Sequence, residues 1–245
     1  MVDLKEFEQK AADLRVLGMK ISIGQDTVYE KYWDEDCRRN IYSASKSFTS
    51  CAVGFAVQEG LIDLDERLMD AFKEDIPNNP DENLKKATVK DLLTMTLGQE
   101  KGFLMGKQRP RMEEQNWVKA SLAIPFMYEP GTHFVYNNVG PYLAGILVQR
   151  RAGCDLLSYL TPRLLKPLGI RKTIWEVDPE GNTFGAGGLF LTVSELHKLG
   201  MFYLQNGCWN GKKLLSKEWI HESTRKQVEN NKNSYGYGYL FWGGR

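Results

Sequence analysis

The residues in this sequence that could do chemistry begin with a serine and a lysine three positions apart, Ser43 and Lys46. Apolar residues at i, i+3, i+4 spacing between Phe48 and Ala56 predict a helix here, so the two side chains share a face within hydrogen-bond reach. A serine becomes a nucleophile when a base removes its proton. Lysine can be that base only where burial or a nearby cation lowers its pKa from about 10.4. The pair predicts acyl transfer, with the N–H groups of the helix start facing the developing oxyanion.

The same spacing has a structural interpretation. In a chain of average composition and this size, S-x-x-K arises about once by chance. A second copy, Ser223–Lys226, lies among polar residues with no apolar stripe after it and predicts a solvated helix end. For the first copy, the structural alternative is an N-cap serine beside a solvated lysine. Motifs further along the chain must decide between the two.

A second group of reactive side chains is Tyr136-Asn137-Asn138. The phenol of Tyr136 can relay a proton, provided that a nearby lysine ammonium favours the phenolate. The amide of Asn138 can hydrogen-bond both a lysine and a substrate carbonyl. The structural alternative is a core tyrosine next to a helix that an asparagine caps.

In this order the two motifs resemble those of the serine β-lactamase and penicillin-binding-protein superfamily, nearest to its class C β-lactamase, D,D-peptidase and esterase branch. The S-x-x-K signature of the family matches Ser43 and Lys46, and its Y-x-N element matches Tyr136 and Asn138. Further landmarks of the branch match residues 88–98, with Leu97 in place of a serine, residues 187–189 and residues 235–239. The resemblance covers nearly the whole chain.

The resemblance implies a serine hydrolase that forms an acyl-enzyme, acting on a β-lactam, a D-Ala-D-Ala-type amide or a small ester. Ser43 would be the acylated nucleophile and its backbone N–H one oxyanion donor. Lys46 would accept the proton of Ser43, and Tyr136 would shuttle protons to the leaving group and from the deacylating water. Asn138 would bind the substrate amide and orient Lys46. No metal and no cofactor are implied.

One family motif has no match in the sequence. A K-T-G or H-x-G triad should follow residues 235–239, but the chain ends at Trp242-Gly243-Gly244-Arg245, too soon for us to assign that motif there. Either the chain is C-terminally truncated, or another chain of an oligomer supplies the missing part. The competing function is a non-catalytic ligand-binding or sensor module. A Ser-His-Asp triad is disfavoured, because no G-x-S-x-G elbow accompanies His133, His197 or His221.

The elements that must position these residues predict an α+β fold in three parts. Residues 1–42 pattern as a helix (3–15) and a β-hairpin (19–23 and 27–33). Residues 43–225 pattern as a mainly helical lobe that starts with the nucleophile helix, and residues 226–245 as a return strand. The expected architecture is β-lactamase/D,D-peptidase-like: an antiparallel sheet with flanking helices, a large helical lobe and a cleft with Ser43 at its floor, lacking the C-terminal strands and helix of the family.

Composition excludes several other classes of protein. The chain has 245 residues, 42% of them hydrophobic and 26% charged, with a net charge of +1 and no block of like charge. We therefore expect neither a nucleic-acid nor an anionic-membrane partner. No apolar segment approaches the about 18 residues of a membrane span, and no signal peptide is recognisable, which predicts a cytoplasmic protein unless a leader was removed. The four scattered cysteines include no C-x-x-C and predict neither a disulfide framework nor a zinc site.

Overall fold

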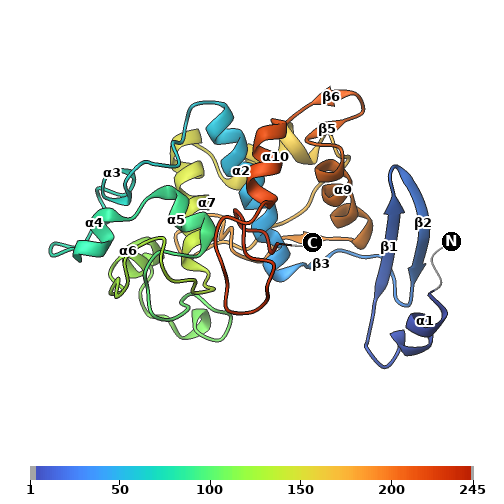
Figure 1. The fold of residues 1–245 in the computed structure, drawn as a ribbon, viewed down its shortest axis with the longest axis horizontal. Helices are drawn as coiled ribbons and strands as arrows, with labels where there is room; N and C mark the ends of the chain where they lie inside the picture. The colour runs from blue at the N-terminus through green and yellow to red at the C-terminus, as the bar shows by residue number, and fades with distance from the viewer. Residues whose placement is uncertain (1–3, 244–245) are drawn as a thin grey trace.

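The computed structural model describes residues 4–243 and has an α+β fold, as predicted (Figure 1). The α-helices are α1 Lys5–Ala11, α2 Ser45–Gln58, α3 Leu68–Ala71, α4 Glu82–Lys86, α5 Val89–Thr94, α6 Trp117–Leu122, α7 Val139–Ala152, α8 Leu156–Leu160, α9 Val193–Leu204 and α10 Lys217–Thr224. Two 3₁₀ turns, η1 Tyr42–Ala44 and η2 Arg109–Arg111, and a π-helical turn, η3 Thr161–Leu165, complete the helical elements. The strands are β1 Gly18–Ile23, β2 Asp26–Tyr32, β3 Arg39–Asn40, β4 Phe190–Leu191, β5 Cys208–Trp209 and β6 Lys212–Lys213.

Helices α2 and α7 pack against each other at the centre of the molecule, with α5 against α7 (Figure 1). Both long helices are buried along most of their length, so they are apolar on nearly every side and not only along one stripe. Helix α10 packs against α2 at Gly54, where an added Cβ would lie 2.4 Å from the indole nitrogen of Trp219. The absence of a side chain at Gly54 is therefore what allows this close contact.

The predicted β-hairpin is confirmed. Strands β1 and β2 pair antiparallel, and α1 packs on them through Phe7, whose ring meets that of Trp33 edge-on at 6.0 Å. Helix α1 is shorter than the predicted 3–15, since it ends at Ala11. This N-terminal unit stands at one end of the molecule beside α9 (Figure 1). It is joined to α9 by a 3.0 Å hydrogen bond between Ser22 and His197, among other contacts.

The return strand predicted for residues 226–245 is wrong for residues 226–243, and residues 244–245 lie outside the described part of the chain. Among the described residues 226–243 there are only isolated bridges, from Tyr237 to Val228 and to Trp242. Gly236 and Leu240 have positive φ angles of 85° and 64°, which turn the segment back on itself, and the N–H of Leu240 donates to the carbonyl of Leu93 in α5 at 2.9 Å. The segment is thus a hook on the helical lobe. Within residues 4–243, β1–β2, β3–β4 and β5–β6 form three separate two-stranded sheets in place of one larger sheet.

Side-chain caps fix the starts of several helices. Thr88 and Asp91 form a capping box at the start of α5, and Thr192 and Glu195 form another at the start of α9. Helix α6 begins at Trp117, because the side chain of Asn116 accepts from the N–H of Lys119 at 2.8 Å and fixes the N-cap there. Local capping chemistry therefore sets where these helices begin.

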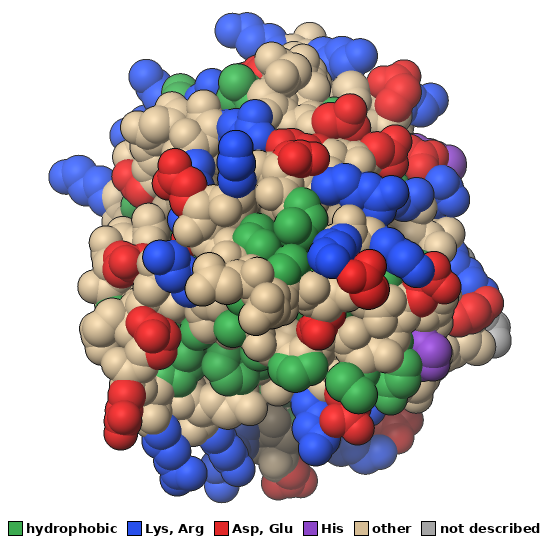
Figure 2. All heavy atoms as spheres, turned by 90° about the vertical axis from the view of Figure 1, so that its left-hand side faces the viewer, with side chains coloured by type: hydrophobic (Ala, Val, Ile, Leu, Met, Phe, Trp, Pro, Cys, Tyr) green, Lys and Arg blue, Asp and Glu red, His purple; other side chains and the backbone are tan. Residues whose placement is uncertain are grey.

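The charge pattern of the surface agrees with the nearly neutral composition. On the face shown in Figure 2, Lys and Arg side chains are interspersed with Asp and Glu, and hydrophobic side chains show at the centre and in a row across the lower part. Within residues 4–243, no helix combines the length and the apolarity needed to cross a bilayer.

Candidate active site

Ser43 lies on the 3₁₀ turn η1, immediately before α2, and its side chain is exposed. The preceding Tyr42 has a positive φ of 48°, and its N–H donates to Oδ1 of Asn40 at 2.7 Å. Helix α2 begins at Ser45, where the side-chain oxygen accepts from the N–H of Leu189 at 3.1 Å. The candidate nucleophile therefore stands on an exposed turn that two side-chain hydrogen bonds hold in place.

Lys46 lies one turn further on and points into the protein, with only 1% of its surface exposed. Its Nζ atom is 3.2 Å from Oγ of Ser43, 2.7 Å from Oδ1 of Asn138 and 2.6 Å from the carbonyl oxygen of Ala186. These oxygens match the three N–H donors of a lysine ammonium. The alternative of a solvated lysine next to an N-cap serine is therefore excluded.

The surroundings of Lys46 change its basicity. Burial, and secondly the positive charge of Arg109, lower the pKa of Lys46 to about 7. Both effects disfavour the charged amine. At neutral pH, then, much of Lys46 is an uncharged amine that can accept a proton, which is the condition the sequence motif requires.

Asn138 is held between Lys46 and the loop that precedes α6. Its Nδ2 donates to the carbonyl of Leu104 at 2.9 Å, so its Oδ1 must be the atom that faces Lys46. The capping role that the structural alternative gave to an asparagine belongs to Asn137, whose Oδ1 accepts from the N–H of Gly140 at 2.9 Å. Asn138 is free to orient the lysine.

Tyr136 closes the other side of the site. Its ring centroid is 5.2 Å from Nζ of Lys46, and the ring stacks on Trp242 with centroids 5.5 Å apart and planes at 22°. Burial raises the pKa of Tyr136, and a hydrogen bond with Ser43 offsets this only in part. Tyr136 is therefore a neutral phenol, and the phenolate considered from the sequence is not favoured.

Several partners in the site were not predicted from the sequence. They are the carbonyls of Leu104 and Ala186, and an ion pair in which Nη1 of Arg109 lies 3.1 Å from Oε2 of Glu176. In the sequence, neither the turn at 185–188 nor the loop at 98–111 carries a pattern that marks it as a neighbour of Lys46. Their closeness to Lys46 arises from tertiary structure, and backbone carbonyls have no sequence signature.

The remaining candidates are structural. Oγ of Ser223 donates to the carbonyl of Ile220 at 3.2 Å, and the side chain is buried, so the second S-x-x-K is a helix end with its serine turned inward. His133 stacks on Tyr128, and His197 bonds Ser22. In the described part of the chain, no group of three or more His, Cys, Asp or Glu side chains could hold a metal ion.

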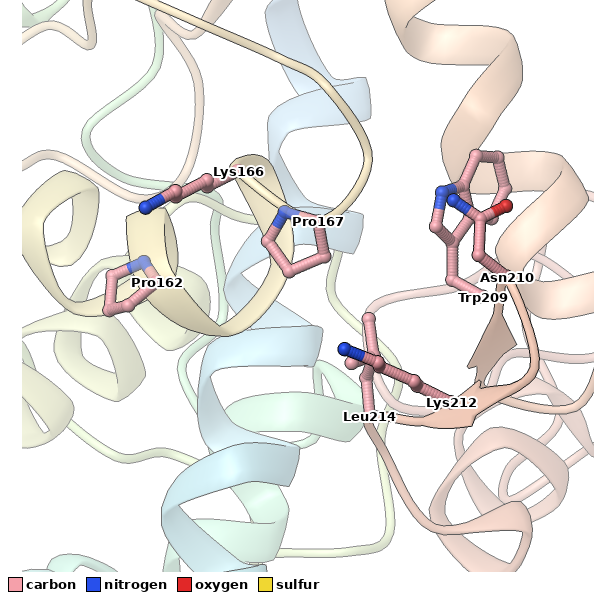
Figure 3. A pocket seen from close by; sticks show the side chains of 7 residues that line it. All are labelled: Pro162, Lys166, Pro167, Trp209, Asn210, Lys212 and Leu214. Carbon is pink, nitrogen blue, oxygen red and sulfur yellow. The ribbon is translucent and has the colours of Figure 1, made fainter.

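A pocket of about 470 Å³ lies away from Ser43, between η3 and the β5–β6 hairpin. Figure 3 shows Trp209 and Asn210 of the hairpin on one side of it and Pro162, Lys166 and Pro167 on the other. No residue of the Ser43 site lines this pocket.

Two curated relatives of this chain are named as an acyltransferase and an esterase. A monacolin J acid methylbutanoyltransferase of Aspergillus terreus is 31% identical over 157 residues, which are 56% of this chain and 37% of that protein. A lovastatin esterase of Penicillium rubens is 31% identical over 150 residues, 52% of this chain and 37% of that protein. The alignments thus span little more than a third of the length of these two relatives.

An octameric penicillin-binding protein homologue from Pyrococcus abyssi has a similar fold, with a TM-score of 0.78 and 22% identity over 98% of this chain and 64% of that chain. At this identity the likeness shows the fold alone. A family model described as Beta-lactamase matches residues 5–243. The chain therefore belongs to the beta-lactamase family, whose members include esterases and acyltransferases.

Proposed function

We propose that the protein is a serine hydrolase that cleaves small carboxylic esters through an acyl-enzyme on Ser43. The observation that carries the proposal is the placement of Lys46: a buried amine with a pKa of about 7, within 3.2 Å of an exposed serine hydroxyl. A structural lysine would have no need of a lowered pKa beside a serine, whereas a general base requires one close to the working pH.

The hydrogen bonds of Lys46 favour proton transfer in one direction. Oδ1 of Asn138 and the carbonyl of Ala186 can only accept, so they take the two N–H groups of the neutral amine. The lone pair is then left for the hydroxyl of Ser43. In the first step Oγ of Ser43 bonds to the acyl carbon, its proton moves to Nζ of Lys46, and the backbone N–H of Ser43 stabilises the oxyanion.

Collapse of the tetrahedral intermediate requires a proton for the leaving oxygen. We assign this proton to the phenol of Tyr136, which is neutral and hydrogen-bonded to Ser43. The Lys46 ammonium then restores the phenol proton. Water attacks the acyl-enzyme with the same groups acting in reverse, which returns Ser43 and the neutral amine.

The choice of an ester rests on the relatives. Two of them are named as an esterase and an acyltransferase. A β-lactam or a D-Ala-D-Ala-type amide would use the same nucleophile and the same proton transfers. The test described next therefore includes a β-lactam beside the ester.

The test is intact-protein mass spectrometry after incubation with a fluorophosphonate and, separately, with a β-lactam, together with hydrolysis of p-nitrophenyl butyrate and nitrocefin. We expect a single adduct and ester turnover that Ser43→Ala abolishes. The matched control is Ser223→Ala, in the second S-x-x-K, which should keep both. Turnover that survives Ser43→Ala removes this serine from the mechanism. A folded protein with no adduct would favour the ligand-binding module.

A further inference from the structure

The loop between Gln99 and Asn116 places a second cation near the site. Arg109 lies on η2 with 24% of its side chain exposed, and its guanidinium lies over the ring of Phe184 at 4.2 Å. The same guanidinium pairs with Glu176, and its Nε is buried without a hydrogen-bond partner. A charged side chain held in this way is only partly solvated, so its field is weakly screened.

Glu176 joins the two segments that surround Lys46. Its Oε1 accepts from Nδ2 of Asn40 at 3.2 Å, and Asn40 in turn accepts from the N–H of Tyr42, next to the nucleophile. The backbone of Glu176 makes 2.9 Å hydrogen bonds to Phe184 and Gly188, on either side of Ala186. Gly188 has a φ of 81°, and an added Cβ would lie 2.5 Å from the Glu176 side chain, so only glycine permits this approach.

We propose that Arg109 is a positioning residue of the Ser43 site: through its ion pair with Glu176 and its stacking on Phe184 it fixes the turn that carries Ala186, and it keeps a positive charge beside Lys46. This inference rests on the proposed function, since it concerns the residue that would serve as base.

Within residues 4–243, none of the groups that contact Lys46 is charged, so Arg109 is the charged group that acts on it. Ser43, Asn138 and the Ala186 carbonyl are uncharged, and Tyr136 is a neutral phenol. Of the causes that lower the pKa of Lys46, burial is the larger and the charge of Arg109 the second. Arg109 therefore acts on Lys46 by charge, while Glu176 holds Arg109 in place and partly neutralises it.

The two partners of the ion pair should consequently have different effects. Loss of the cation in Arg109→Gln should raise the pKa of Lys46, whereas Arg109→Lys keeps the charge and should largely restore it. Loss of the carboxylate in Glu176→Gln leaves the Arg109 cation unneutralised, so this variant should not raise the pKa of Lys46. If Arg109 and Glu176 only braced the loop, both Gln variants would admit water and raise the pKa of Lys46 together.

The experiment is an NMR titration of the full chain labelled with ¹³C at lysine Cε, with the Lys46 signal assigned from Lys46→Arg. This readout needs no catalytic activity. The rate of fluorophosphonate labelling is measured beside it as a function of pH. A rise of one unit in Arg109→Gln lowers the neutral fraction of Lys46 at pH 7 from about one half to about one in eleven, so labelling at pH 7 should slow about fivefold.

An unchanged Lys46 midpoint in Arg109→Gln, or an equal rise in both Gln variants, overturns the inference. If circular dichroism shows that Arg109→Gln does not fold, Arg109→Lys and Glu176→Gln are compared with the unsubstituted protein. A raised titration midpoint of Lys46 in both variants overturns the inference. A midpoint as low as in the unsubstituted protein in both variants supports it. A midpoint that responds to Arg109 in a protein that forms no adduct would support the inference and refute the proposed function.

Discussion

The buried amine of Lys46 should make the stability of the protein depend on pH in a defined way, and its removal should abolish that dependence. The pKa of Lys46 is about 7 in the folded protein and about 10.4 in an unfolded chain. Between these values the unfolded state binds more protons, so the free energy of unfolding rises with pH. Below pH 7 the folded state bears the full penalty of the buried charge, and above about pH 10.4 it bears none.

The magnitude follows from the pKa difference. Each unit corresponds to about 1.4 kcal/mol, so the unfolding free energy of the wild type relative to Lys46→Met should increase by about 4 kcal/mol between pH 7 and pH 10. The sign of the stability difference between the two proteins at pH 7 alone is not informative. Methionine relieves the penalty on the charge, but it leaves Oδ1 of Asn138 and the carbonyl of Ala186 without a donor, at about 1–3 kcal/mol each. Only the change of this stability difference with pH isolates the effect of the buried amine.

The assay is urea unfolding followed by tryptophan fluorescence at one-unit steps from pH 7 to pH 10, with the slope of each transition checked for constancy. Other titrating groups cancel in the difference between the two proteins. Lys90→Met is the matched control, since it removes a lysine whose side chain is exposed. A difference that stays flat from pH 7 to pH 10 would refute the depressed pKa and with it the role of Lys46 as base.

Three further predictions test other parts of the structure. Tyr136→Phe should slow turnover of an alkyl ester by about 10²–10⁴-fold but should affect fluorophosphonate labelling far less, because fluoride leaves without a proton; equal losses in both rates would contradict this. Asn138→Asp places a carboxylate at the position now 2.7 Å from the amine and should raise the pKa of Lys46, which moves the labelling-pH profile to higher pH. In urea unfolding, Gly54→Ala should destabilise the protein by about 1–3 kcal/mol, because its Cβ would lie 2.4 Å from an indole nitrogen. Gly200→Ala, whose Cβ would meet nothing within 4 Å, should be neutral or stabilising by up to about 1 kcal/mol, and an equal loss in both glycine variants would rule out the steric explanation.

The parts of the site that could be predicted are those encoded locally. Ser43 and Lys46 lie three residues apart at the start of one helix, and their hydrogen bond follows from helical geometry. Asn138 was recognised from its motif. Its exact contact with Lys46, 92 residues away in the chain, is a product of the packing of α2 on α7. The ion pair of Arg109 and Glu176 depends on two loops and left no periodic pattern to detect.

The wrong prediction of a return strand over residues 226–243 has a related cause. Alternating Tyr and Gly predicts a strand, because a period of two places one set of side chains on a single face. A strand also needs partners for its backbone, and here the N–H groups of Tyr239 and Leu240 donate to carbonyls of Ser223 and Leu93 on helices α10 and α5. The buried rings of Tyr237 and Tyr239 are packed in a hook and not on a sheet. A strand pattern therefore predicts secondary structure less reliably than a helix pattern when the sequence does not identify the pairing partner of the strand.

The three oxygens around the amine of Lys46 bear on the barrier to proton transfer. The Ala186 carbonyl is part of a braced turn, Asn138 is tied to Leu104, and Ser43 stands on a turn fixed by Asn40. These three oxygens form a cage around the amine, and they accept three N–H groups from the ammonium. When the amine is neutral, two of them accept its N–H groups and the hydroxyl of Ser43 donates to its lone pair. Proton uptake thus requires hydrogens to shift and no heavy atom to rotate, so little reorganisation energy should separate the two protonation states, and the cage is complete before a substrate arrives.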